Sequence, residues 1–334
     1  MLNPSGGSTV TAYMDTITGG NLACLGAETP TATTTRDPSV AAVAVKFPQH
    51  RHSQDATINA LTEFAGPEFR RFALSSGVRA RHTALPLSRY RQLSGFTEAN
   101  DAFVDVALDV GEQALRAALD EAEVRPSEID IVFSTTVTGL AVPTLEARLA
   151  TRVGLRQDKS VANLIATSLF GDGAAAVVLQ GAARTAVGSV GLPKVLATRS
   201  RLYPGTEEVM GWKIGSDGFR IVLSVDVATV TEKYLGNDVR RFLADHGLTT
   251  DDVTTWVCHP GGPRVIEAVE NALELPADAL DDTRKSLRDN GNLSSVWVLD
   301  VLRAAMADPP PPGSIGVMIA MGPAFCSELV LLKW

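Results

Sequence analysis

The chain contains one pattern of secondary structure twice, and this duplication constrains its fold more than any other feature. The first copy begins with a helix whose apolar residues share one face, at Phe103, Ala107, Val110, Ala114 and Ala117. A turn, a strand over residues 129–135 and a second helix, LEARLATRVGL, follow. In the second copy the helix YLGNDVRRFLADHGL leads through a similar turn to the strand in WVCHPGGP and to the helix RVIEAVENALEL. The repeat predicts an α/β protein with two similar βαβ-type halves and helices on both sides of the sheets.

The two copies differ after their second helix. The second copy continues through a loop that opens at Gly291-Asn292 into another helix, and a closing pair of apolar strands follows. In the first copy only RQDKS separates the helix from VANLIATSLFGDGAAAVVL. A strand–helix–strand block takes ~30 residues or more, so the first half is short of one block unless VANLIATSLF replaces it. One short helix cannot replace a central strand, and we therefore expect a deletion near residues 156–160.

Composition narrows the classes of protein. In 334 residues, hydrophobic content of 45% and charged content of 20% are typical of a globular α/β protein with an ample core. A net charge of −8 argues against a general nucleic-acid binder. No apolar stretch reaches the roughly 18 residues of a membrane helix. The cysteines are too few and scattered for a disulfide framework and indicate a cytoplasmic location; they are Cys24, Cys258 and Cys326. No ligand cluster indicates a metal.

Composition also divides the chain into segments. Residues 1–38 are rich in Gly, Thr, Ser and Ala, with no Lys or Arg before Arg36, and lack the features of a signal peptide. We interpret them as a disordered leader. The N-terminal half is then expected at residues 39–182, with the internal deletion near 156–160, and the C-terminal half at residues 183–334.

The segment WVCHPGGP places a thiol beside an imidazole, which suggests a nucleophile and its base. Successive side chains of a strand point to opposite faces, so if His259 faces a cavity, Cys258 faces away and is a small buried residue. Cys326 lies on a predicted strand, with no helix start or basic neighbour to lower its pKa. Neither thiol is a convincing nucleophile. By itself His259 could equally be a satisfied strand-end histidine, and Asn292 an ordinary turn or N-cap residue.

Several segments together resemble type III polyketide synthases of the chalcone synthase family, and most of all the bacterial alkylpyrone-type enzymes. These segments are WVCHPGGPRVIEAVE, RDNGNLSSVWVL, LFGDGAAAVVL and VTGLAVPTLEARL. The resemblance covers nearly everything from about Val40 to Trp334, and HPGGP with GNLSS is specific in combination. The ketoacyl-carrier-protein synthases share the fold, but HPGGP favours the polyketide synthase branch. The resemblance implies a thiolase-like fold of duplicated αβαβα layers, a homodimer and a Cys-His-Asn site.

The resemblance also implies a chemistry. The family's cysteine takes an acyl group from a CoA thioester and joins it to carbanions made by decarboxylating malonyl-CoA. Its histidine and asparagine donate hydrogen bonds to the thioester oxygen as that oxygen becomes an enolate. His259 matches this histidine and Asn292 this asparagine. The cysteine belongs between TRVGLR and KSVANL, which are separated here by Gln157 and Asp158 alone, so the nucleophilic cysteine is not present.

The resemblance also implies roles for further residues, and some of these residues have an alternative role. The implied substrate-binding residues are Phe170, Thr138, Val142, Ile221 and Gly211. Phe170 matches a gatekeeping phenylalanine or is a core aromatic, and Ile221 replaces a second aromatic gatekeeper, which would open the pocket for a long aliphatic starter. Val142 falls where the family sends a side chain across the dimer interface. The implied CoA-binding residues are Arg71, Arg70, Arg79 and Arg81, for which a solvated basic surface is the alternative.

Taken together, the sequence predicts an acyltransferase that condenses a long-chain acyl-CoA starter with malonyl-CoA by decarboxylative Claisen chemistry to alkylpyrone-type polyketides. Its activity is expected to be impaired because the nucleophile is absent. The alternative is a catalytically dead paralogue, a heterodimer partner or a mis-assembled gene product that retains at most malonyl-CoA decarboxylation. CoA thioesters are the expected substrates, with no cofactor, and a homodimer is expected, with no nucleic acid and no membrane span.

Overall fold

The computed structural model describes one compact unit of the chain, which begins after the predicted leader. The described residues are 37–334 except 66, 137, 142–143, 156–159, 166–171, 182–190, 207, 216–217, 225, 260 and 324. Residues 1–36 of the predicted leader, which include Cys24, therefore lie outside the described residues, as do Phe170 and Val142. None of the helices in the described part is long and apolar enough to cross a membrane.

The central element is a mixed six-stranded sheet with the order β10-β11-β12-β7-β1-β6. β10 runs parallel to β11, and the other neighbours are antiparallel. Four of its strands come from the second half of the chain and two from the first. They are β7 (Lys194–Leu202), β10 (Val253–His259), β11 (Ile315–Gly322), β12 (Cys326–Lys333), β1 (Ser39–Lys46) and β6 (Ala174–Gln180).

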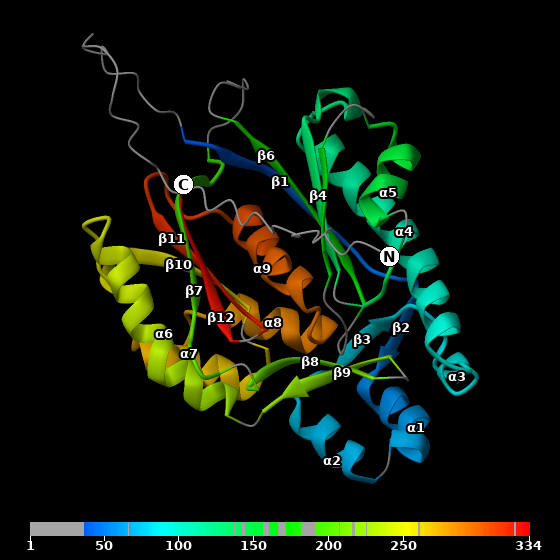
Figure 1. The fold of residues 1–334 in the computed structure, drawn as a ribbon. Helices are drawn as coiled ribbons and strands as arrows, with labels where there is room; N and C mark the ends of the chain where they lie inside the picture. Colours follow the sequence, from blue (N-terminus) through cyan, green and yellow to red (C-terminus); the bar gives the residue numbers. More distant parts are fainter. Residues whose placement is uncertain are drawn as a thin grey trace, which may run out of the picture. The chain divides into compact units, whose positions relative to one another are not determined.

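Helices cover this sheet in layers, and Figure 1 shows α8 and α9 between the β10–β11–β12–β7 strands and the strands β1, β6 and β4. α9 packs against both β1 and β10, so the sheet curls around it. α6 and α7 lie outside the first layer, and α4 and α5 outside the second. The α/β architecture with alternating layers is as predicted. The bounds are α4 (Phe96–Glu121), α5 (Leu145–Val153), α6 (Val227–Ala244), α7 (Pro263–Leu273), α8 (Asp281–Asn290) and α9 (Ser295–Ala307).

Smaller elements complete the described chain. β2 pairs with β3, and β8 with β9, each pair forming an antiparallel two-stranded sheet. α1 and α2 lie between β2 and β3 in the chain, and α3 follows β3. The bounds of these strands and helices are β2 (His50–Ser53), α1 (Gln54–Ala65), α2 (Pro67–Ser75), β3 (Ala80–Thr83), α3 (Leu87–Tyr90), β8 (Met210–Gly215) and β9 (Gly218–Leu223).

The duplication extends to local detail at the entry of β4 (Ile131–Thr136) and β10. A short 3-10 turn precedes each strand. In both turns a backbone N–H donates to the carboxylate three residues later, from Arg125 to Glu128 at 3.0 Å and from Thr249 to Asp252 at 2.8 Å. Such a bond satisfies a backbone donor that the turn leaves open. The two strands are thus counterparts.

The halves differ in what joins these counterparts to the main sheet. β11 lies between β10 and β12 and pairs with both. β4 pairs in parallel with β5 (Ser160–Ile165), in a separate two-stranded sheet, and no described strand bridges it to β6. Apolar side chains are consequently exposed on both sides of this break: Ile131 at 55%, Phe133 at 73% and Leu179 at 62%.

The connections before β5 and β11 differ as well. Between α7 and β11 the second half has α8 and α9, whereas between α5 and β5 the first half has only residues 154–159. Residues 161–165 of VANLIATSLF belong to β5, and residues 166–170 lie outside the described part of the chain. The β-branched Val161 and Ile165 favour a strand, and the open edge of β4 offers backbone partners.

The close packing of α6 on α7 gives the first prediction. A β-carbon added at Gly236 of α6 would lie 2.3 Å from the carbonyl oxygen of Ala272 on α7. Alanine normally stabilises a helix relative to glycine, but here the two backbones would have to separate. We expect Gly236→Ala to lower the free energy of unfolding by about 1–3 kcal/mol in denaturant titration. Gly181→Ala, whose β-carbon would meet nothing within 4 Å, is the control and should leave it nearly unchanged.

Candidate active site

His259 is the last residue of β10, at the carboxyl end of the strand. Its imidazole meets the indole of Trp297 edge to face, with ring centroids 5.3 Å apart and an angle of 82°. Among the described residues, the buried Nδ1 has no hydrogen-bond partner, although His259 as a whole is only half-buried. Burial lowers the pKa of His259 to about 4. The side chain is therefore a neutral imidazole at physiological pH.

Asn292 lies in the loop between α8 and α9 and is 8% exposed. Its Nδ2 donates to the carbonyl oxygen of Gly261 at 3.0 Å, and its Oδ1 accepts from the backbone N–H of Ser294 at 2.8 Å. The amide therefore ties the loop after His259 to the start of α9. Ser294 has a φ of 52°, in a region that non-glycine residues rarely adopt and that is frequent at functional sites. The structure thus brings the HPGGP and GNLSS segments together.

Asp300 of α9 fixes the loop that carries Asn292, and it is only 4% exposed. Its carboxylate accepts from Ser286 Oγ at 2.7 Å and from Asn290 Nδ2 at 3.3 Å, both on α8. Arg303 donates to the other oxygen at 2.8 Å. A buried carboxylate with three partners is a strong constraint on the two helices that flank the loop. Asp300 is a polar residue within the apolar run VWVLDVL, and that position was the available sequence signal.

Cys258 lies in the hydrophobic core, with 1% exposure. Burial, and then the charge of Glu270 on α7, raise the pKa of its thiol far above the usual range. Its backbone carbonyl accepts from Thr283 on α8. A thiol in this environment stays protonated and is a poor nucleophile.

Cys326 begins β12 and is half-buried. Burial raises the pKa of its thiol, and the charge of Glu328 raises it further. The preceding Phe325 is fully buried at a φ of 45° and packs on Tyr203, while Ala324 lies outside the described residues. In the described part of the chain, Cys258 and Cys326 are the cysteines, and neither has a basic neighbour that would lower its pKa.

The predicted CoA-binding arginines lie on α2, on β3 and in the turn between them. Arg70 and Arg71 are exposed on α2, and the guanidinium of Arg71 lies 5.0 Å from the ring centroid of Phe72. Arg79 is exposed, and its backbone N–H donates to the carbonyl of Arg288 on α8 at 2.9 Å. Arg81 points inward instead: it donates to Gln54 Oε1 at 2.8 Å, and burial lowers its pKa.

The turn before β3 also adjoins the His259 loop. A β-carbon added at Gly77 would lie 3.6 Å from Cγ of Pro263, in HPGGP. The exposed arginines are therefore on a segment that adjoins the HPGGP loop and is hydrogen-bonded to α8, the helix before the loop of Asn292.

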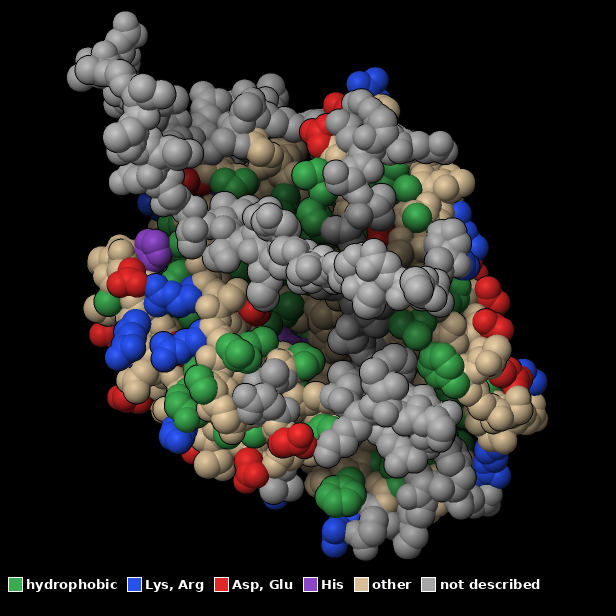
Figure 2. All heavy atoms as spheres, in the orientation of Figure 1, with side chains coloured by type: hydrophobic (Ala, Val, Ile, Leu, Met, Phe, Trp, Pro, Cys, Tyr) green, Lys and Arg blue, Asp and Glu red, His purple; other side chains and the backbone are tan. Residues whose placement is uncertain are grey.

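A second basic surface is ion-paired. Figure 2 shows lysine and arginine side chains over the side of α6 and β7. Arg201 donates to Asp238 at 2.6 Å and Arg240 to Glu274 at 3.0 Å, and Arg199 pairs with Asp245. Neighbouring carboxylates neutralise this face, so it is a poor candidate for binding phosphates.

The structure describes the remaining predicted substrate-binding residues only in part. Thr138 follows β4, half-buried, and its backbone N–H donates to Thr136 Oγ1 at 3.2 Å. Gly211 on β8 pairs with Val222, and Ile221 on β9 pairs with Trp212. The side chain of Ile221 lies outside the described part. Phe170 and Val142 remain predictions.

The layered fold, with a histidine and an asparagine on two joined loops, is that of the thiolase-like class. Two solved structures share it. PKS-I from the brown alga Ectocarpus siliculosus has a TM-score of 0.82 at 22% identity, covering 91% of this chain and 100% of that one. The 1,3,6,8-tetrahydroxynaphthalene synthase of Streptomyces coelicolor A3(2) has a TM-score of 0.80 at 23% identity, covering 89% and 99%.

Within this class the chain belongs to the type III polyketide synthases. Residues 194–334 match the family described as "Chalcone and stilbene synthases, C-terminal domain". The chain is also 42% identical over 354 residues to the 1,3,6,8-tetrahydroxynaphthalene synthase of Streptomyces peucetius subsp. caesius, covering 90% of this chain and 94% of that protein. The predicted fold and family are confirmed.

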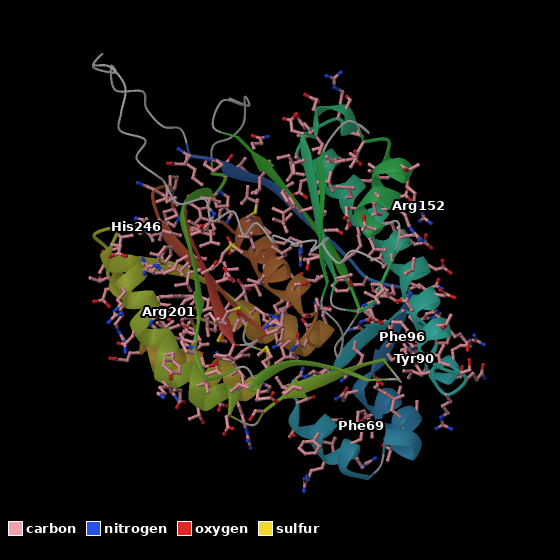
Figure 3. The ribbon with its side chains drawn as sticks, in the orientation of Figure 1. Phe69, Tyr90, Phe96, Arg152, Arg201 and His246 are labelled. Atoms are coloured by element: carbon pink, nitrogen blue, oxygen red, sulfur yellow. The ribbon has the colours of Figure 1, made fainter. Side chains whose placement is uncertain are left out.

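The buried imidazole predicts a pH dependence of stability. His259 has a pKa of about 4 when folded, against about 6.5 when unfolded. As the pH falls through this window, the unfolded state takes up a proton that the folded state does not, so stability is lost. His259→Gln should lose about 2 kcal/mol less than the wild type between about pH 7 and pH 4.5 in denaturant titrations. His246, exposed after α6 (Figure 3), supplies the control His246→Gln. Equal losses in all three proteins would contradict the prediction.

Proposed function

We propose that the chain is a type III polyketide synthase-like acyltransferase from which the nucleophilic cysteine is missing, and that it retains decarboxylation of malonyl-CoA. One observation carries the proposal. The second half has α8 and α9 before β11, but the first half passes from α5 to β5 through residues 154–159 alone. The family's cysteine is expected in this interval, at the start of a helix equivalent to α9.

The alignment with the Streptomyces peucetius enzyme supports the deletion. It extends over 354 residues, more than the 334 residues of this chain. It therefore includes positions at which that enzyme has residues and this chain has none. The exposed Ile131, Phe133 and Leu179 beside the break also fit the loss of a layer that would have covered them.

The remaining site fits the first step of the chemistry. In decarboxylation of a malonyl thioester, the bond to the carboxylate carbon breaks, CO₂ leaves, and the electron pair moves into an enolate. Nε2–H of neutral His259 and the free N–H of the Asn292 amide donate to the enolate oxygen. Two preorganised donors stabilise charge where it develops. Protonation of the enolate carbon by water then gives acetyl-CoA.

Chain extension needs a thiolate that holds the growing acyl group, and the raised pKa values of Cys258 and Cys326 do not favour this role. We infer that an intact site of this type would accept a long-chain acyl-CoA starter and form alkylpyrone-type products, because Ile221 replaces an aromatic gatekeeper. A second candidate product is tetrahydroxynaphthalene, after the relative with 42% identity. Arg70, Arg71 and Arg79 are the proposed contacts to CoA phosphates, with Arg81 supporting them from within.

The assembly and origin of the chain follow from the same proposal. We propose a cytoplasmic homodimer, as the resemblance implies. The alternatives are a dead paralogue and a heterodimer partner of an intact relative. Either of these, assayed alone, would show no decarboxylation of malonyl-CoA. Sequencing the coding DNA around residues 156–160 separates them all from a mis-assembled gene, which would contain an intron, frameshift or gap there.

The test measures the rate at which acetyl-CoA is released from malonyl-CoA, with chromatography used to quantify the product. The wild type should exceed His259→Ala by at least about tenfold, since loss of one enolate donor typically costs 10²–10³ in rate. His246→Ala, which changes an exposed histidine, should match the wild type. If the wild type is no faster than His259→Ala, the retained activity does not exist and the dead paralogue is the better description.

A further inference from the structure

Trp297 occupies an unusual position for a core aromatic. It lies in the first turn of α9, directly after the loop of Asn292, and is fully buried. Its indole Nε1 has no hydrogen-bond partner among the described residues, and neither has Nδ1 of His259, whose ring it meets edge to face. Buried indole N–H groups usually find an acceptor. The indole of Trp297 thus packs against the imidazole of His259 although its own Nε1–H is left without an acceptor among the described residues.

The orphaned Nδ1 selects one tautomer of His259. A proton on Nδ1 would be a buried donor without an acceptor, whereas a lone pair there leaves no donor unsatisfied. The favoured neutral form therefore carries its proton on Nε2. This is the tautomer that can donate a hydrogen bond to a substrate oxygen.

We propose that Trp297 is a positioning residue for His259. Its indole packs edge to face against the imidazole, excludes water from the Nδ1 side of that ring and so presents Nε2–H to the substrate. The functional meaning of this role rests on the proposed function, because it requires His259 to be the donor. Trp297 itself does not touch the reacting atoms and is not a catalytic residue.

Other groups near β10 do not account for the state of the imidazole. Charged residues on the helices that flank β10 include Asp300 and Arg303 on α9, Arg288 and Asp289 on α8, and Glu267 and Glu270 on α7. Burial is the cause of the lowered pKa of His259. Asp300 is occupied by Ser286, Asn290 and Arg303. The enclosure of the imidazole by Trp297 is therefore the feature that a substitution can change to alter the pKa of His259.

The experiment measures the pKa of His259 by NMR of ¹³C-labelled histidine, which needs no substrate or turnover. The chain has 5 histidines, and His259→Gln assigns the resonance. In Trp297→Leu, water should reach the imidazole and raise its pKa by at least about one unit, towards the ordinary 6.5. Trp297→Phe should raise it less, because a ring remains. Trp256→Phe changes another core tryptophan, which is 7% exposed and lies on β10, the strand that ends at His259. This substitution should leave the pKa of His259 near 4.

The outcomes decide the proposal. A pKa that rises in Trp297→Leu and stays in Trp256→Phe supports it, as does a ¹⁵N shift pattern of the Nε2–H tautomer in the wild type. An unchanged pKa in folded Trp297→Leu, an equal rise in Trp256→Phe, or an Nδ1–H tautomer overturns it. If Trp297→Leu does not fold, Trp297→Phe decides by the same criterion. Failure of acetyl-CoA release would leave these readings intact, so the two proposals fail separately.

Discussion

The pairing of β11 with β10 is the interaction on which the site depends. β11 holds β10 in the main sheet, and α9, which precedes β11, packs against β10. His259 at the end of β10 therefore meets the first turn of α9, and Asn292 just before α9 reaches back to Gly261. Strand, helix and loop form one unit, so His259 and Asn292 are held in place by the fold itself.

In the described part of the first half, no strand joins β4 to the main sheet in the way that β11 joins β10. β4 has the same entry turn as β10 but pairs with β5 alone, and apolar side chains on β4 and β6 are exposed. On the proposed function, the second half supplies a pair of donors and the first half lacks the thiol. Such a pair can polarise a thioester, but without the thiol there is nothing on which to hold an acyl chain.

Much of this could be predicted from the sequence because the signals are local or repeated. The apolar strand before HPGGP, the loop at Gly291-Asn292 and the short connection after TRVGLR all follow from order along the chain. Contacts between distant side chains could not be predicted. Nothing local indicates that Trp297 crosses His259, that Asp300 accepts from α8, or that Arg81 turns inward to Gln54. The pairing of residues 160–165 with β4 could not be predicted either, because it is a tertiary contact between segments that are distant in the sequence.

Acyl transfer to the protein tests the missing nucleophile most directly. The chain would be incubated with a long-chain acyl-CoA and digested for mass spectrometry. A second version would carry, between Leu155 and Ser160, the residues that the Streptomyces peucetius enzyme has between the positions aligned with these two. The expected result is no acyl adduct on Cys24, Cys258 or Cys326 in the native chain and an adduct on the inserted cysteine in the other. An acylated thiol in the native chain would contradict the absence of a nucleophile.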